Sequence, residues 1–225
     1  MTFFLTFLSL CCVFQLSFAK ELPLTPEQVQ ALETGELVMV ESPQEDSPWP
    51  LIRAYKLLKT DPETAMGIFA AYDYQKDYVP NMLASDPVSQ NSPTEVQVEY
   101  RLKMPWPLNP VRYVHDHRLS REDGIYRLDW WMIRSTSAEA LKGYTEFHPY
   151  KADSRILMIY ESSITPKSSF AKLFKGAMVS DVHKSLTAIS EEIEKRSLKK
   201  DDELALKYRQ ILQSSLMGKK TWDLN

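Results

Sequence analysis

The sequence is poor in glycine, and its glycines never cluster. The six stand alone, at Gly35, Gly67, Gly124, Gly143, Gly176 and Gly218. Loops that hold nucleotide phosphates need closely spaced glycines, as in the GxGxxG and Walker patterns. Neither pattern occurs, so the usual dinucleotide-binding and P-loop chemistries are excluded.

An excess of positive charge is also lacking. The 225 residues include 27 lysines and arginines and 30 aspartates and glutamates, which gives a net charge of −3 at pH 7. Nucleic-acid binding needs clustered cations that neutralise phosphates, and a polybasic membrane anchor needs them too. We therefore expect no nucleic-acid partner and no polybasic anchor, in a chain whose 44% hydrophobic content is typical of one globular domain.

Charge is absent from the N-terminal segment. Residues 2–19 carry no charged side chain, and the apolar stretch ends in the small residues Ser17 and Ala19 before Lys20. This pattern predicts a signal peptide at 1–19, cleaved after Ala19, and a periplasmic or secreted protein. The alternative is an uncleaved N-terminal membrane anchor, because eighteen uncharged residues are just long enough to span a bilayer.

Cysteine is confined to that segment. The chain has two cysteines, Cys11 and Cys12, so the mature protein would have none. Disulfides, a thiol nucleophile and a cysteine metal site are then excluded from the mature chain. About 200 residues can bury a core that is large enough without disulfides.

Periodicity predicts helices at both ends of the chain and strands between them. Thr25, Pro26 and Gln28 form a helix-start pattern, and Asp61-Pro62 begins a second helix. Alternating apolar residues make 95–103 the clearest strand. Strands are expected at 36–41, 51–59, 95–103, 111–119, 125–134, 143–148 and 155–164, with connections at 42–50 and 104–110.

A long amphipathic helix is predicted at 168–195, because apolar residues recur there every three or four positions. A final helix is expected at 201–216. Strands followed by a helix favour an α+β fold, in which a curved antiparallel sheet wraps around the long helix and leaves a cavity. We divide the chain into 1–19, an N-terminal segment at 20–50, the main domain at 51–196 and a helical extension at 197–225.

The alternation within strands predicts which side chains face that cavity. Aromatic rings and methionines dominate the set, which suits a flat or extended apolar ligand. The other interpretation is an ordinary hydrophobic core. The predicted lining consists of Tyr100, Tyr113, His115, His117, Trp130, Met132, Met158, Tyr160, Phe170, Phe174 and Met178.

The His-x-His pair on one strand face is the main candidate for chemistry. His115 and His117 suit zinc if a carboxylate or His148 completes the site, and one of them suits proton transfer. They also suit a hydrogen-bonded pocket wall. No third ligand is defined by the sequence, so we expect no metal and no cofactor, and we assign no catalytic residue. Paired carboxylates such as Glu191 and Glu192 are expected on solvated helix faces.

Several short motifs, and the order in which they follow one another, resemble the START-like superfamily of polyketide cyclases, lipid-transfer proteins and coenzyme-Q-binding proteins. The resemblance covers about residues 35–194, and the residues that carry it follow one another along the chain. They are Asp61-Pro62-Glu63-Thr64-Ala65, Asp73-Tyr74, Tyr78-Val79-Pro80, Pro105-Trp106-Pro107-Leu108, Arg112-Tyr113-Val114, Asp123-Gly124, Gly143-Tyr144, Ile159-Tyr160 and Thr165-Pro166.

The match has one departure, because Asn109-Pro110-Val111 separates the Pro-Trp-Pro loop from the strand that follows it. The resemblance implies a helix-grip fold, with a curved sheet that holds the C-terminal helix over an apolar cavity. It also implies a lipid, sterol, isoprenoid or polyketide-like ligand. It transfers no catalytic residue, because the superfamily shares none.

Three functional hypotheses follow. The first is a monomeric carrier of a hydrophobic ligand or lipid, without a cofactor, for which transient membrane contact is left open. The second is a cyclase- or hydratase-like enzyme in which His115 or His117 acts with Tyr113 or Tyr160 as acid and base. The third is a ligand-free interaction module whose helix after Lys200 docks a partner, and it requires an exposed apolar face on 201–216.

Overall fold

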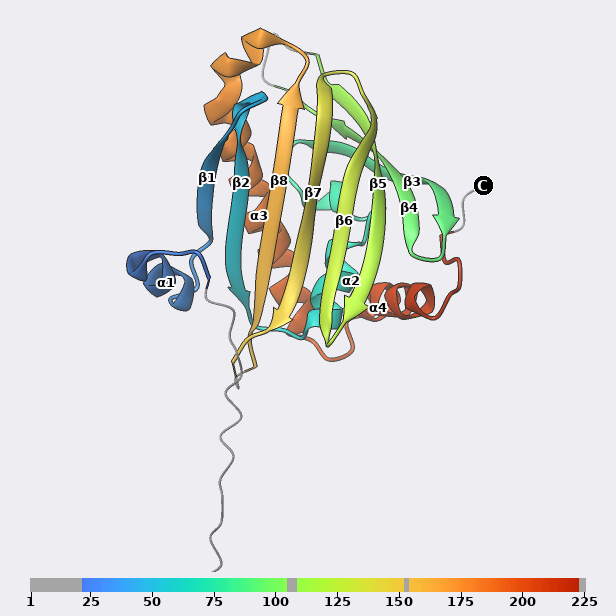
Figure 1. The fold of residues 1–225 in the computed structure, drawn as a ribbon. Coiled ribbons are helices and arrows are strands. Elements are labelled where there is room, and N and C mark those ends of the chain that lie inside the picture. The colour runs from blue at the N-terminus through green and yellow to red at the C-terminus, as the bar shows by residue number, and fades with distance from the viewer. Residues whose placement is uncertain (1–21, 105–108, 152–153, 223–225) are drawn as a thin grey trace, which may run out of the picture.

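The computed structural model describes residues 22–104, 109–151 and 154–222. Eight strands form one antiparallel sheet in the order β1-β2-β8-β7-β6-β5-β4-β3 (Figure 1). The strands are β1 (Val38–Gln44), β2 (Ser47–Leu58), β3 (Met82–Ser92), β4 (Glu95–Leu102), β5 (Val111–Glu122), β6 (Ile125–Ser135), β7 (Ala138–Pro149) and β8 (Ile156–Pro166).

The helices pack on both faces of this curved sheet. Side chains of α2, α3 and α4 share one hydrophobic core with the sheet, whereas α1 covers a smaller cluster around Tyr55 and Leu157. We call the face that packs against α2, α3 and α4 the inner face. The helices are α1 (Pro26–Glu33), α2 (Pro62–Phe69), η1 (Gln75–Asp77), η2 (Ser169–Phe174), α3 (Lys175–Ser197) and α4 (Glu203–Leu216).

Local capping signals begin these helices as the sequence predicts. Thr25 and Gln28 form a complete capping box at α1, and the Asp61 side chain accepts a hydrogen bond from the Thr64 amide at α2. Asp202 does the same for the Ala205 amide at α4. Each cap satisfies an amide that has no partner within its helix.

The expectation of an irregular connection at 42–50 is wrong, because β1 and β2 form a hairpin across it. Pro43 lies at an irregularity on the edge strand β1. Pro48 and Pro50 precede Ile52, where the pairing of β2 with β8 begins. Prolines are tolerated at such places because no ladder hydrogen bond needs their missing amide.

The second edge strand, β3, was not predicted. Pro87 breaks its pattern, but in the structure Pro87 lies beside a register shift in the pairing of β3 with β4. β7 also begins at Ala138, five residues earlier than expected. Edge strands and strand ends are the parts of a sheet whose local sequence is least constrained by burial.

The long helix predicted at 168–195 is divided in two. A 3₁₀ segment, η2, occupies Ser169–Phe174, and α3 then runs to Ser197. Figure 1 shows α3 crossing behind β1, β2 and β8, with α2 and α4 at the opposite end from η2. Among the described residues, no helix combines the length and hydrophobicity that a bilayer-spanning helix needs.

The predicted C-terminal helix is confirmed as α4, which packs closely on α2. A Cβ atom on Gly67 would lie 3.3 Å from the backbone of Tyr208 and Arg209, so glycine there allows the two helices to approach. Ala205, Tyr208 and Leu212 are buried by this contact. The interaction-module hypothesis therefore lacks the exposed apolar face that it requires.

Glu192 is buried, contrary to the expectation that it lies on a solvated helix face. Its carboxylate accepts hydrogen bonds from the Tyr74 hydroxyl (2.7 Å), the Arg196 Nε (2.6 Å) and the Lys195 Nζ (2.9 Å). Arg196 also pairs with Asp202 at 3.1 Å. Burial by itself would raise the Glu192 pKa, but these hydrogen bonds outweigh it and lower the pKa. The cluster joins α3 to α4 and to the segment after α2.

Glu192→Ala leaves the Arg196 guanidinium without its main partner inside the protein. We expect this variant to lower the free energy of unfolding by about 3 kcal/mol. Urea denaturation followed by circular dichroism measures the change. Glu191→Ala is the matched control, because Glu191 is exposed on the same helix, and it should change stability by less than about 0.5 kcal/mol. Equal stability of the two variants would contradict a structural role for the cluster.

Candidate ligand-binding hollow

Burial of the inner-face side chains decreases along the central strands. In Figure 1 the lower end is where α2 and α4 lie, and the upper end is where β5 begins and β6 and β8 end. Inner-face side chains near the lower end are buried, and those near the upper end are only half-buried. The buried set includes Leu119, His117, His115, Leu128, Trp130, Phe147 and Met158, and the half-buried set includes Tyr113, Met132, Leu141 and Tyr160.

The same gradient runs along α3. Leu186, Ile189 and Ile193 are buried, whereas Phe174, Met178 and Val182, nearer the upper end, are half-buried. Apolar side chains of the sheet and the helix would bury one another if the two closed completely. The upper ends of sheet and helix therefore keep apolar surface that they do not bury against each other.

Two tyrosines of the sheet lie in this region. Burial raises the pKa of Tyr113 and Tyr160, yet both residues keep accessible surface. We call the region bordered by the half-buried side chains of Tyr113, Met132, Tyr160, Phe174 and Met178 the hollow.

The structure divides the predicted lining into three groups. Five predicted residues border the hollow, as defined above. Five others are buried below it, and the Phe170 side chain lies outside the described residues. The buried five are Tyr100, His115, His117, Trp130 and Met158. The strand phasing inferred from alternation is thus consistent with the burial observed, while ligand contact by these residues stays a prediction.

Aromatic rings surround the histidine pair. The His115 ring lies 4.5 Å from that of Tyr113, and the His117 ring lies 4.8 Å from that of Tyr72. The Tyr100 hydroxyl and His117 Nε2 are 3.2 Å apart and hydrogen-bonded. Burial lowers the pKa of His115 to about 3 and that of His117 well below its ordinary value. Both imidazoles are therefore neutral near pH 7.

The zinc interpretation of this pair gains no support. Within the described part of the chain, no group of three or more His, Cys, Asp or Glu side chains is arranged to hold a metal ion. His148, considered as the third ligand, pairs instead with Glu146 at 2.8 Å.

Gly143 is a contributor that the sequence analysis did not select. A Cβ atom at this position would lie 2.6 Å from the Trp130 ring and 2.3 Å from the Glu161 carbonyl oxygen. Glycine lets the Trp130 ring lie flat against β7, with its centroid 5.4 Å from that of Tyr160. An isolated glycine inside a strand pattern is the signal that points to such a close approach.

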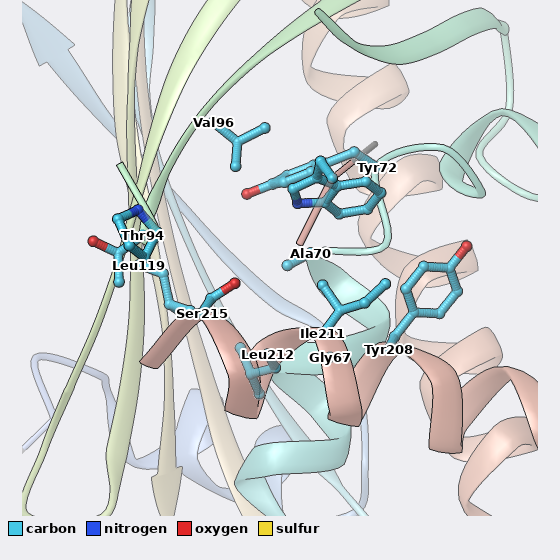
Figure 2. A pocket seen from close by; sticks show the side chains of 12 residues that line it. Gly67, Ala70, Tyr72, Thr94, Val96, Leu119, Tyr208, Ile211, Leu212 and Ser215 are labelled. Atoms are coloured by element: carbon cyan, nitrogen blue, oxygen red, sulfur yellow. The ribbon is translucent and has the colours of Figure 1, made fainter. Parts of the chain in front are cut away.

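A separate small cavity lies at the lower end, between α2, α4 and the sheet (Figure 2). Its volume is about 30 Å³, and its lining includes Tyr72, Val96, Leu212 and Trp222. This volume suits about one water molecule rather than a ligand. Gln90 Oε1 accepts the amides of Thr221 and Trp222 at 3.0 and 3.1 Å, which holds the C-terminal segment against β3.

The low pKa of His115 predicts a specific pH dependence of stability. Below about pH 6.5 the unfolded chain takes up a proton at His115, whereas the folded protein does so only near pH 3. Lowering the pH from 7 to 5 therefore favours the unfolded state, by about 2 kcal/mol per buried histidine.

His115→Phe should remove about 2 kcal/mol of this loss, as measured by urea denaturation at pH 7 and pH 5. His148→Phe is the control, because His148 is only half-buried. The same loss of stability between pH 7 and 5 in wild type and His115→Phe would show that His115 is not a neutral buried group.

Comparisons with known proteins give a likeness in structure alone. No protein-family model matches the sequence, and no curated protein sequence matches it. A STAR-related lipid transfer protein from Xanthomonas axonopodis is similar in structure, with 15% identity and a TM-score of 0.60. The match covers 70% of this chain and 98% of that protein.

Two further solved structures extend the comparison. Human STARD10 has 13% identity and a TM-score of 0.53, with 87% of this chain and 84% of that chain covered. The Zhui aromatase/cyclase from Streptomyces sp. R1128 has 7% identity and a TM-score of 0.53, with 67% and 96% covered. The chain therefore has the α+β helix-grip fold that these solved structures share.

Proposed function

We propose that this protein binds, and carries, a hydrophobic small molecule or lipid in the hollow between the sheet and α3. The observation that carries the proposal is the burial gradient. Tyr113 and Met132 on the sheet and Met178 on the helix are only half-buried. Residues nearer the lower end on the same faces, such as His115 and Leu186, are buried. An apolar ligand would complete the burial of both surfaces.

The size of the apolar contribution is sufficient for binding. Burying about 300 Å² of apolar ligand surface contributes on the order of 7 kcal/mol before ordering costs. Binding would therefore need no charged contact. Methionines and aromatic rings in the lining suit such a ligand, because they adapt to irregular apolar shapes.

The protonation of the histidine pair supports a carrier over an acid–base enzyme. Efficient general acids and bases have pKa values near the working pH. Burial lowers the pKa of His115 to about 3 and raises that of Tyr113 and Tyr160, so none of the three is poised near neutrality. The fold does not separate the two hypotheses, since similar structures include a lipid transfer protein and an aromatase/cyclase.

We further propose that the protein is exported to the periplasm or secreted after cleavage of residues 1–19. The support is the uncharged segment that ends in small residues before Lys20. Mass spectrometry of the protein recovered outside the cytoplasm should find Lys20 as its first residue. An intact N-terminus, with the chain in the membrane fraction, would instead indicate the uncleaved anchor.

Ligand extraction tests the carrier function directly. We expect organic extraction of the purified protein, followed by mass spectrometry, to recover a hydrophobic compound in near-stoichiometric amount. We also expect the uncharged fluorophore N-phenyl-1-naphthylamine to bind the extracted protein. Met132→Trp should weaken probe binding by about tenfold or more, because a larger side chain fills part of the hollow.

Ile133→Trp is the matched control for that variant. Ile133 neighbours Met132 on β6, at the irregularity in the pairing of β6 with β5, and is 45% exposed. It should leave probe binding and ligand recovery unchanged. Equal effects of the two substitutions, or no bound compound and no probe binding in wild type, would refute the proposed function.

A further inference from the structure

Two ring nitrogens of the histidine pair are buried without a hydrogen-bond partner. They are His115 Nε2 and His117 Nδ1. Buried polar atoms in folded proteins are almost always paired, because each unpaired one forfeits its hydrogen bond to water. The hydrogen bond between Tyr100 and His117 uses His117 Nε2, so it does not pair His117 Nδ1. The lack of a partner for His115 Nε2 and His117 Nδ1 therefore needs an explanation.

The position of the pair connects these vacancies with the hollow. On β5 the residue next above His115 on the inner face is Tyr113, which is half-buried and borders the hollow, whereas His115 and His117 are buried. The imidazoles therefore lie at the floor of the hollow, where the accessible part of the inner face ends. Their ring centroids are 5.8 Å apart, so the two imidazoles are neighbours on the inner face.

The surroundings of the pair select an uncharged partner. Ring contacts to the histidines come from Tyr72, Tyr100, Tyr113 and Trp130, all of which are neutral near pH 7. A carboxylate or phosphate at this floor would lose its hydration, and a neutral imidazole supplies no compensating charge.

Among uncharged groups, a hydroxyl fits best. A neutral imidazole has one nitrogen that donates and one that accepts. The tautomer of His117 depends on whether Tyr100 donates or accepts, so the free nitrogens present donors, acceptors or one of each. A hydroxyl group donates one hydrogen bond and accepts up to two, so it serves two donors or one donor and one acceptor. A carbonyl or ether oxygen only accepts.

We propose that the ligand carries a hydroxyl group, as an alcohol or phenol, and that this group hydrogen-bonds to His115 Nε2 and His117 Nδ1 at the floor of the hollow. The inference rests on the proposed function. Neither nitrogen is accessible in the ligand-free protein. Admitting the hydroxyl therefore requires a neighbouring side chain to move, and Tyr113, whose ring centroid lies 4.5 Å from that of His115, borders both the pair and the hollow.

A pair of isomeric probes tests the inference on the full mature chain. N-phenyl-1-naphthylamine is bound first and then displaced with 1-decanol, with its isomer 1-methoxynonane, or with decanoate. The two isomers have the same atoms, but the ether cannot donate a hydrogen bond. We expect 1-decanol to displace the fluorophore at a concentration about tenfold lower than either competitor, which is a typical effect of satisfying a buried polar group.

Removing the imidazole should remove this preference. In His115→Phe we expect 1-decanol and 1-methoxynonane to compete equally, while the fluorophore itself still binds. His148→Phe is the matched control, because His148 is half-buried and pairs with Glu146, and it should keep the tenfold preference. Thermal unfolding of each variant checks that it is folded, and His117→Phe replaces His115→Phe if the latter does not fold.

The outcomes separate the two proposals. If the fluorophore binds and wild type does not distinguish the isomers, the hydroxyl inference is overturned and the proposed function stands. A buried water would then be the partner of the two unpaired ring nitrogens. A preference that survives in both histidine variants also overturns it. If neither the fluorophore nor any extracted compound binds, the proposed function itself fails.

Discussion

The architecture depends on how α3 is attached to the sheet. Its C-terminal half is fixed by Leu186 and Ile193 in the core and by the hydrogen-bonded cluster of Glu192, Arg196 and Tyr74. Its N-terminal half has only half-buried apolar residues. The buried charge cluster and the apolar contacts act on the same C-terminal half of α3, so the helix stays in position although its N-terminal half is less tightly packed on the sheet.

At the floor of the hollow, burial of the histidines in the core opposes the hydrogen bonding of their ring nitrogens. Burying neutral histidines beside Tyr100 and Trp130 extends the core, but it leaves two ring nitrogens without partners. Such vacancies reduce stability in the free protein. Under the hydroxyl proposal, a bound ligand rather than the protein completes the hydrogen bonding of these nitrogens. The proposed carrier function is thus consistent with a floor of neutral histidines, which suits an uncharged ligand group.

The parts of the fold that the sequence predicted well are those controlled by near neighbours. Thr25 and Asp61 sit directly before the helices that they cap, and alternation placed Tyr100, His115 and Trp130 on the buried inner face. The failures lie where distant parts of the chain decide. Pro43 lies in the stretch expected to be a connection, and Pro87 lies in a strand that was not expected, but both residues are on edge strands, and edge position is a property of the sheet order.

By itself, the sequence determined the α+β class, the starts of α1 and α2, the inner-face residues of the central strands and the lack of phosphate-binding loops, because each follows from local propensity or spacing. Only the tertiary structure decided that Glu192 is buried, that Gly143 makes room for Trp130 and that α4 packs on α2. It also decided which inner-face residues border the hollow and which lie beneath it. Periodicity reports which face of a strand is turned inward, whereas depth along that face depends on where a helix far away in the chain comes to rest.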